Sequence, residues 1–292
     1  MKSIFNRGLI AVVLFSFVCA SSISAQVKIT LNPEKGKQYE FRYEINQQMT
    51  MLMQDQEMPM ENKMLFVLEM TVADKTTESI TLSYLFKRMD FSFSNPMMGE
   101  MSYSTDQEAP TSEFALALAV SAKLLIGKSF QATMTPDGEV IKINGVQEWL
   151  ANSSSGPMTE QLLQQFSDES LTNMSRQNFN YYPKEAVKVG DTWNCDLNLN
   201  IGMSAVNSVC TLKSVSDKTA VIDLVSQVKI DSLPMAETDL AGTQTGTIIV
   251  DLETGIPVSQ DIMIKVEGKL STPDQDINMK MTTQGKSTTK EL

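Results

Sequence analysis

The chain has 292 residues, with 35 acidic residues against 24 basic ones, a net charge of −11 at pH 7 and no histidine. The missing histidine excludes Ser-His and Cys-His nucleophiles, a histidine general base and histidine-ligated zinc. The acidic balance argues against nucleic acid or an anionic membrane as a partner. Because nucleotide-binding and nucleophile motifs are missing as well, we expect a protein that is not an enzyme and needs no cofactor.

The first 25 residues have the pattern of a secretory signal peptide. A basic start and a short apolar run over residues 8–18 lead to a small-residue cleavage site after Ala25. No later apolar stretch is long enough to cross a bilayer. We therefore expect a mature chain of residues 26–292 that is exported to the periplasm or the cell surface and has no transmembrane segment. Lipidation at Cys19 is the alternative.

A long methionine-rich hairpin is predicted at the start of a first β unit that covers residues 26–146. Apolar and polar residues alternate in both arms with the period of a half-buried strand. If residues 54–57 form the turn, Met53 lies opposite Met58, and Arg42 lies opposite Glu69 on the other face. The apolar face is the candidate ligand-binding surface, and it is lined by Tyr39, Phe41, Tyr43, Ile45, Met51, Met53, Met58, Met60, Phe66 and Leu68.

The methionines at the tip of this hairpin allow two interpretations. Methionine is flexible and polarizable, so it suits irregular cores and promiscuous apolar surfaces. Thioethers are also soft ligands that select Cu(I), and an alternative metal site would consist of Met51, Met53, Met58 and Met60. Because these residues continue a hydrophobic ladder and no histidine is available to help, we predict an apolar surface and no metal.

An apolar helix is predicted over residues 111–126. It has a Thr-Ser start, an acidic first turn and Gly127 as a stop signal. Only Glu113 and Lys123 interrupt its apolar surface, so we expect it to be buried on several sides. It would fill or gate the concave face of the first β unit. A helical connector of residues 147–180 follows.

A second β unit is predicted over residues 181–292. Cys195 and Cys210 lie in the stretch WNCDLNLNIGMSAVNSVCTL, which begins with a period-2 alternation. A two-residue turn at Gly202 and Met203 places the two cysteines directly opposite each other. We therefore predict a disulfide hairpin, since exported chains meet an oxidising compartment; two free buried thiols are the alternative. The C-terminal STTKEL is expected to fray.

Three pairs of similar segments occur in the same order in the two units. GKQYEF at 36 matches GDTWNC at 190, VADKTTESITLSYLF at 72 matches VSDKTAVIDLVSQV at 215, and GKSFQATMTPDGEVIKI at 127 matches GTIIVDLETGIPVSQDI at 246. The shared order indicates a duplicated β unit. The predicted fold is therefore mainly β (α+β). It has two related antiparallel units with long curved strands, open and half-barrel-like, and inserted helices.

Several of these features together resemble a known type of protein. The signal peptide, the methionine-rich hairpin, the Val-Gly-Asp-Thr-Trp stretch at 189–193 and the strand pair after it look like a secreted domain-of-unknown-function family of Bacteroidetes-type bacteria. Long antiparallel strands around an apolar helix are also similar, at the level of fold, to periplasmic half-barrel carriers of lipids and lipoproteins. The resemblance covers most of the mature chain and implies no catalytic residue.

Three functions are compatible with the sequence. The first is an exported, non-catalytic envelope protein that binds an apolar ligand or partner, a lipid-like small molecule or an envelope protein, on its concave β face. The second is a methionine-rich periplasmic protein that binds Cu(I). The third is a purely structural surface protein with a packed interior.

Overall fold

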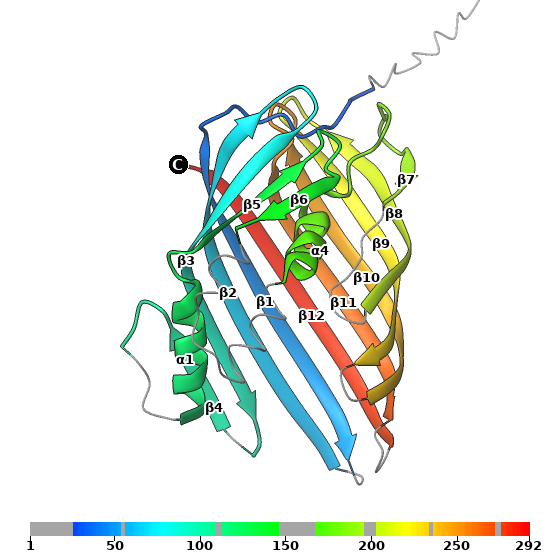
Figure 1. Ribbon diagram of the computed structural model, residues 1–292. Helices are drawn as coiled ribbons and strands as arrows, with labels where there is room; N and C mark the ends of the chain where they lie inside the picture. The colour runs from blue at the N-terminus through cyan, green and yellow to red at the C-terminus, as the bar shows by residue number, and fades with distance from the viewer. Residues whose placement is uncertain are drawn as a thin grey trace, which may run out of the picture.

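The computed structural model describes residues 26–53, 56–97, 99–108, 113–145, 167–195, 203–233, 236–271 and 276–292 (Figure 1). The predicted signal peptide and the part of the predicted connector before residue 167 lie outside these ranges. Both therefore stay predictions. Among the described helices, none is long and apolar enough to cross a membrane.

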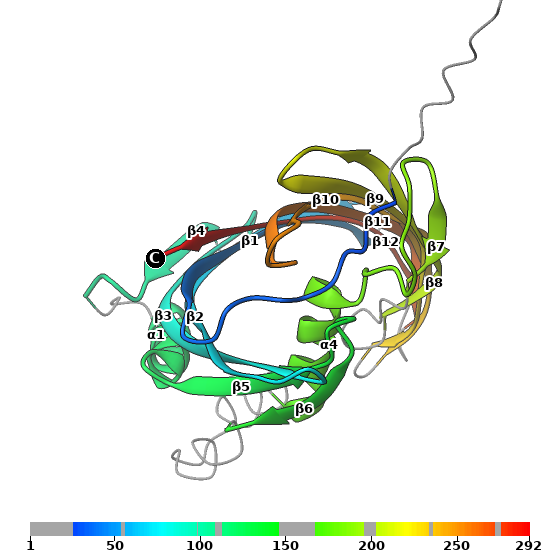
Figure 2. The ribbon, with the colours of Figure 1, turned by 90° about the horizontal axis from the view of Figure 1, so that it is seen from above.

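The described strands form one antiparallel sheet in the order β6-β5-β3-β2-β1-β12-β11-β10-β9-β8-β7, with β4 paired to β3. Because β6 and β7 lie at opposite ends of this order, the sheet stays open and curves like a half-barrel (Figures 1 and 2). This confirms the predicted fold class. The strands are β1 (Gln38–Met53), β2 (Gln56–Lys75), β3 (Ile80–Asn95), β4 (Gly99–Ser104), β5 (Ser129–Met134), β6 (Val140–Asn144), β7 (Thr192–Asn194), β8 (Met203–Val215), β9 (Thr219–Leu233), β10 (Ala236–Asp251), β11 (Pro257–Ser271) and β12 (Asp276–Glu291).

The strands of the two predicted β units form the two halves of one continuous sheet, and the division of the chain into two units stays a prediction. In the first half β1, β2, β3, β5 and β6 pair one after another, and in the second half β7, β8, β9, β10 and β11 do the same. The matched sequence segments fall at corresponding turns, such as the β2–β3 and β8–β9 turns. Pairing of β1 with β12 joins the halves. A duplication as the origin of this likeness stays a prediction.

The C-terminal strand β12 lies at the centre of the sheet, between β1 and β11 (Figure 1). The expectation that STTKEL frays is wrong, because these residues pair with β1 as far as Glu291 opposite Tyr39. Ser287 is buried on the inner side of this ladder. A strand with neighbours on both sides holds even small polar residues in place, since its backbone N–H and C=O groups find partners on both flanking strands.

The curved sheet encloses the helix α4 (Asp168–Phe179), as seen from above in Figure 2. Ser167 caps this helix by accepting a hydrogen bond from the backbone N–H of Ser170 over 3.2 Å. Leu171 and Phe179 of α4 are buried in one cluster with Tyr39 of β1 and Leu224 of β9. We call the face of the sheet that carries these residues the inner face, and this cluster the main core.

The predicted apolar helix is confirmed as α1 (Glu113–Leu125). Its small residues Ala119 and Ala122 pack against Phe91 of β3 and Tyr103 of β4, at the edge of the inner face. The expected burial on several sides is wrong, because Leu116 and Val120 on another side of α1 are exposed by 42% and 55%. The helix therefore covers one margin of the concave face.

A second, smaller apolar cluster lies toward the distal end of the sheet, where β1 ends and β12 begins. It is separate from the main core. Met49, Met51 and Ile264 pack against it while remaining half-buried. We call it the distal cluster, and it consists of Val228, Ile230, Leu240, Val266, Met279 and Met281.

Candidate binding face

The inner face is uncharged along most of its length. Successive side chains of a strand point to opposite faces, so every second residue lies on this face; in β9 the even-numbered residues from Ala220 to Ile230 are buried, and the residues between them are half-buried or exposed. Between the row of Phe41 and the row of Met51, the inner positions of β1, β2, β9, β10, β11 and β12 hold no Asp, Glu, Lys or Arg. Ionised residues such as Glu44 and Lys265 occupy the opposite face.

The predicted hairpin is present, but its register is shifted by two residues. Met53 lies opposite Gln56, so Met51 faces Met58 and not Met60. Side chains alternate with a period of two, so the shift leaves on the inner face every predicted apolar residue whose side chain the structure describes. The side chain of Met53 lies outside the described residues. Pro59 has no backbone N–H to donate to a neighbouring strand, and the sheet accommodates it because β2 pairs with β3 only from Glu61 onward.

The predicted pair of Arg42 with Glu69 is wrong for the same reason. Arg42 lies opposite Val67 and pairs with Glu44 on its own strand, with 3.9 Å between Nη2 and Oε1. Glu69 pairs with Lys87 of the neighbouring strand at 3.4 Å.

The predicted ligand-binding residues divide into two groups. Tyr39 and Leu68 are buried in the main core, and Phe41 and Phe66 pack against it. This end of the predicted ligand-binding surface is therefore part of the main core. The remaining residues lie nearer the distal end and are half-buried wherever the side chain is described: Tyr43, Ile45, Met51, Met58 and Met60.

Tyr43 fills the space above a glycine on the neighbouring strand. A Cβ atom at Gly285 of β12 would lie 3.1 Å from the Tyr43 hydroxyl. Burial raises the pKa of Tyr43 above its usual value. The half-buried apolar surface available on the inner face therefore begins at Ile45, beyond this ring.

Six methionines form two rows across three neighbouring strands at the distal end. The register places Met49 between Met60 and Met281, and it places Met51 between Met58 and Met279. Met279 and Met281 are buried, and the others are half-buried. The patch therefore differs from the predicted set of four methionines. It includes Met279 and Met281 of β12, which sequence reasoning missed. The alternation of Ile277, Met279 and Met281 was the available signal.

Polar residues form one row across the inner face, between the main core and the distal cluster. Asn62 Nδ2 donates to Gln47 Oε1 over 3.1 Å, and Gln47 Nε2 donates to Thr283 Oγ1 over 3.3 Å. On the other side of Ile264, Gln244 lies opposite Ser226. Ile264 interrupts the row, and Ser208 of β8 lies at its end. We call the polar residues of this row the polar row: Asn62, Gln47, Thr283, Gln244, Ser226 and Ser208.

Cys195 and Cys210 are both buried, and their side chains contact each other without a bond between the sulfurs in this structure. The predicted opposition is wrong, because Cys210 lies opposite Trp193 and the backbone N–H of Cys195 donates to Ser208. A hydrogen bond with Cys195, together with burial, raises the pKa of the Cys210 thiol well above its usual value. A disulfide between these residues stays a prediction. The turn at Gly202 falls outside the described residues.

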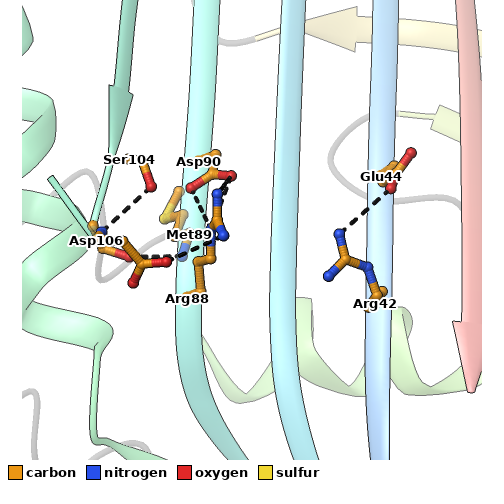
Figure 3. A network of polar contacts seen from close by, with 8 residues as sticks. Arg42, Glu44, Arg88, Met89, Asp90, Ser104 and Asp106 are labelled. Carbon is orange, nitrogen blue, oxygen red and sulfur yellow. Dashed lines mark hydrogen bonds and ion pairs between the residues drawn. The ribbon is translucent and has the colours of Figure 1, made fainter. Parts of the chain in front are cut away.

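A groove of about 540 Å³ lies along the outer face of β1 to β4. Arg88 lines this groove and lies between Asp90 and Asp106, with Nη2–Oδ2 and Nη1–Oδ2 distances of 2.7 and 3.1 Å (Figure 3). The hydrogen bond to Asp90 raises the pKa of the guanidinium. Glu44, Lys63 and Lys286 also line the groove, so charges of both signs are distributed along it. No group of His, Cys, Asp and Glu able to hold a metal occurs among the described residues.

Comparison with solved structures gives distant likenesses. A lipovitellin structure, whose subject is lipid–protein interactions, is 11% identical with a TM-score of 0.48, covering 88% of this chain and 25% of the lipovitellin chain. An outer membrane channel from Pseudomonas putida F1 is 8% identical with a TM-score of 0.26, covering 89% and 97%. A domain of a putative outer membrane lipoprotein-sorting protein from Vibrio parahaemolyticus is 8% identical with a TM-score of 0.15, covering 83% of each chain.

Comparison with curated proteins gives no match. A family of unknown function matches residues 77–257, which is more than half of the chain and includes strands of both halves of the sheet. The predicted likeness to a family of unknown function is thereby confirmed, while an origin in Bacteroidetes-type bacteria stays a prediction. The chain belongs to the family of unknown function DUF6263.

Proposed function

We propose that this protein is an exported, non-catalytic carrier that holds an elongated apolar ligand on the inner face of its sheet. The observation that supports this most is the uncharged inner face, on which half-buried apolar side chains lie beyond the main core, at Ile45 and, across the polar row, at the methionines. Ligand sites are mostly apolar with a few polar groups. Methionine adapts to ligands of differing shape.

The ligand class follows from the chemistry of this face. An ionised group buried there would find no opposite charge, so the buried part of the ligand is uncharged. A chain of methylene groups fits a surface that extends along several strands. Each further methylene that becomes buried contributes about 0.8 kcal/mol, which tightens binding about fourfold.

The test is displacement of a fluorescent fatty-acid analogue by a series of alkyl chains of increasing length. We expect affinity to rise by about fourfold per methylene until the surface is filled. Ile45→Glu places a charge on the inner face and should abolish binding. Asn46→Glu places the same charge on the exposed outer face and serves as the matched control. Equal binding by both variants, with folding verified by circular dichroism, would contradict the proposal.

A second candidate function is Cu(I) binding by the six-methionine patch, which is favoured by its two rows of three thioethers on neighbouring strands. Replacing all six methionines with leucine separates the two functions. Leucine keeps volume and hydrophobicity, so carrier binding should persist. Leucine has no sulfur, so copper binding would be lost. We expect the parent not to compete for Cu(I) with a bicinchoninate-type chelator.

Export is part of the proposal and rests on the predicted signal peptide. Intact-mass measurement of the mature protein should give an N-terminus at Gln26. A lipid-modified Cys19 would contradict export as a free chain.

A further inference from the structure

The side chains at one end of the polar row have hydrogen-bond partners, and those at the other end have polar atoms without one. On the first side, Asn62, Gln47 and Thr283 are joined by hydrogen bonds. On the second side, Ser208 Oγ, Ser226 Oγ and Gln244 Oε1 are buried and have no hydrogen-bond partner in the described structure. These residues are only 5%, 0% and 4% exposed.

The three unsatisfied groups are neighbours. Gln244 of β10 lies directly opposite Ser226 of β9. Ser208 of β8 lies in the irregular stretch between the pairs Val206–Gln227 and Val209–Val225, beside Ser226. Buried polar atoms in folded proteins are almost always paired, because an unpaired one loses its bonds to water without replacement. Three unpaired atoms on adjacent strands therefore indicate a missing partner.

The chemistry of the missing partner can be read from these groups. The oxygen of Gln244 accepts a hydrogen bond, and each serine hydroxyl can donate one and accept others. No charged side chain lies on the inner positions of this row, so a carboxylate or phosphate would be buried without a counter-charge. The fitting group is neutral and both donates and accepts, as a hydroxyl or a primary amide does.

The surroundings of the three groups are apolar in both directions along the strands. Leu224 lies on the side of the main core, and Val228 lies on the side of the distal cluster. We propose that Ser208, Ser226 and Gln244 bind the neutral hydroxyl or amide group of an amphiphile whose apolar part lies along the inner face. This inference rests on the proposed carrier function and assigns the ligand class.

The binding test uses four ligands with the same tail: 1-dodecanol, dodecanamide, dodecanoate and dodecane, each measured by displacement of a fluorescent apolar probe. We expect the alcohol and the amide to bind more tightly than the other two. Gln244→Leu and Ser226→Ala should each weaken alcohol and amide binding by about fivefold per hydrogen bond lost. Dodecane binding should be unchanged.

Gln260→Leu provides a matched control. Gln260 is also a buried glutamine on the inner face, but its Nε2 donates to the carbonyl oxygen of Asn178 over 3.3 Å. In ligand-free protein we expect Gln244→Leu and Ser226→Ala to raise the melting temperature, because an unpaired buried group is removed, and Gln260→Leu to lower it. This thermal readout also shows that each variant folds.

Three results would overturn the inference. Equal affinity for all four ligands would refute the assigned head group while leaving the carrier function standing. A lower melting temperature for both Gln244→Leu and Ser226→Ala, without any head-group preference, would mean that buried water already satisfies these atoms. Failure of all four ligands to bind the parent protein would refute the carrier function and this inference together.

Discussion

Replacing Met281 with alanine tests the central position of β12. Met281 is 9% exposed and lies between Met49 of β1 and Val266 of β11. Removing a buried methionine side chain costs about 2–5 kcal/mol, from lost burial and the cavity left behind. The variant also loses the contact of Gln47 Nε2 with the Met281 sulfur at 3.1 Å. We expect the free energy of unfolding to fall by about 3 kcal/mol.

The matched control is the preceding residue on the same strand. Lys280 points to the outer face, where its side chain is 79% exposed and lies 3.8 Å from Glu267. Lys280→Ala should therefore change the free energy of unfolding by less than about 1 kcal/mol. Urea titrations with an unchanged m-value give both numbers. A small effect at Met281 together with a large one at Lys280 would refute the register of β12.

Three further predictions concern groups elsewhere in the sheet. Protein folded under oxidising conditions should have a disulfide between Cys195 and Cys210, so a thiol reagent should find no free thiol after unfolding. Reducing this disulfide should lower the free energy of unfolding by about 3 kcal/mol. Two reactive thiols would contradict the prediction. Burial raises the pKa of Tyr84 above its value in the unfolded chain. The buried neutral tyrosine therefore contributes its full stability below pH ~10, and this contribution is lost as the pH rises further. Alkaline titration followed by tyrosine absorbance would detect the raised pKa. A double-mutant cycle on Arg88 and Asp90 should give a coupling of about 1 kcal/mol or less that decreases with salt, because both side chains are partly exposed.

Alternation in the sequence predicted which residues share a face, but it did not predict register. The β1–β2 hairpin and the segment with Cys195 and Cys210 both differ from expectation by two residues. A two-residue shift leaves every side chain on its predicted face, so the hydrophobic pattern cannot detect it. Turn length decides between such registers, and the polar stretch before Met58 allowed either length.

Long-range pairing was the part of the fold that local patterns could not reveal. Ser287 of β12 is small and polar, as expected for a frayed end, and it is buried because it lies on the inner face of a strand that pairs with β1 and β11. Met279 and Met281 were missed as members of the methionine patch for the same reason. The exposure of Leu116 on α1 likewise depends on where the helix packs, which its apolar composition alone did not indicate.

Native mass spectrometry of the protein, purified without detergent from the organism that makes it, tests the carrier function most directly. We predict a species heavier than the chain alone, from which organic solvent releases an uncharged amphiphile with a hydroxyl or amide group. A mass equal to the ligand-free chain, combined with failure to take up dodecanol or dodecanamide, would contradict the account and favour a purely structural role. A mass increase of a copper ion would contradict it in favour of the methionine metal site.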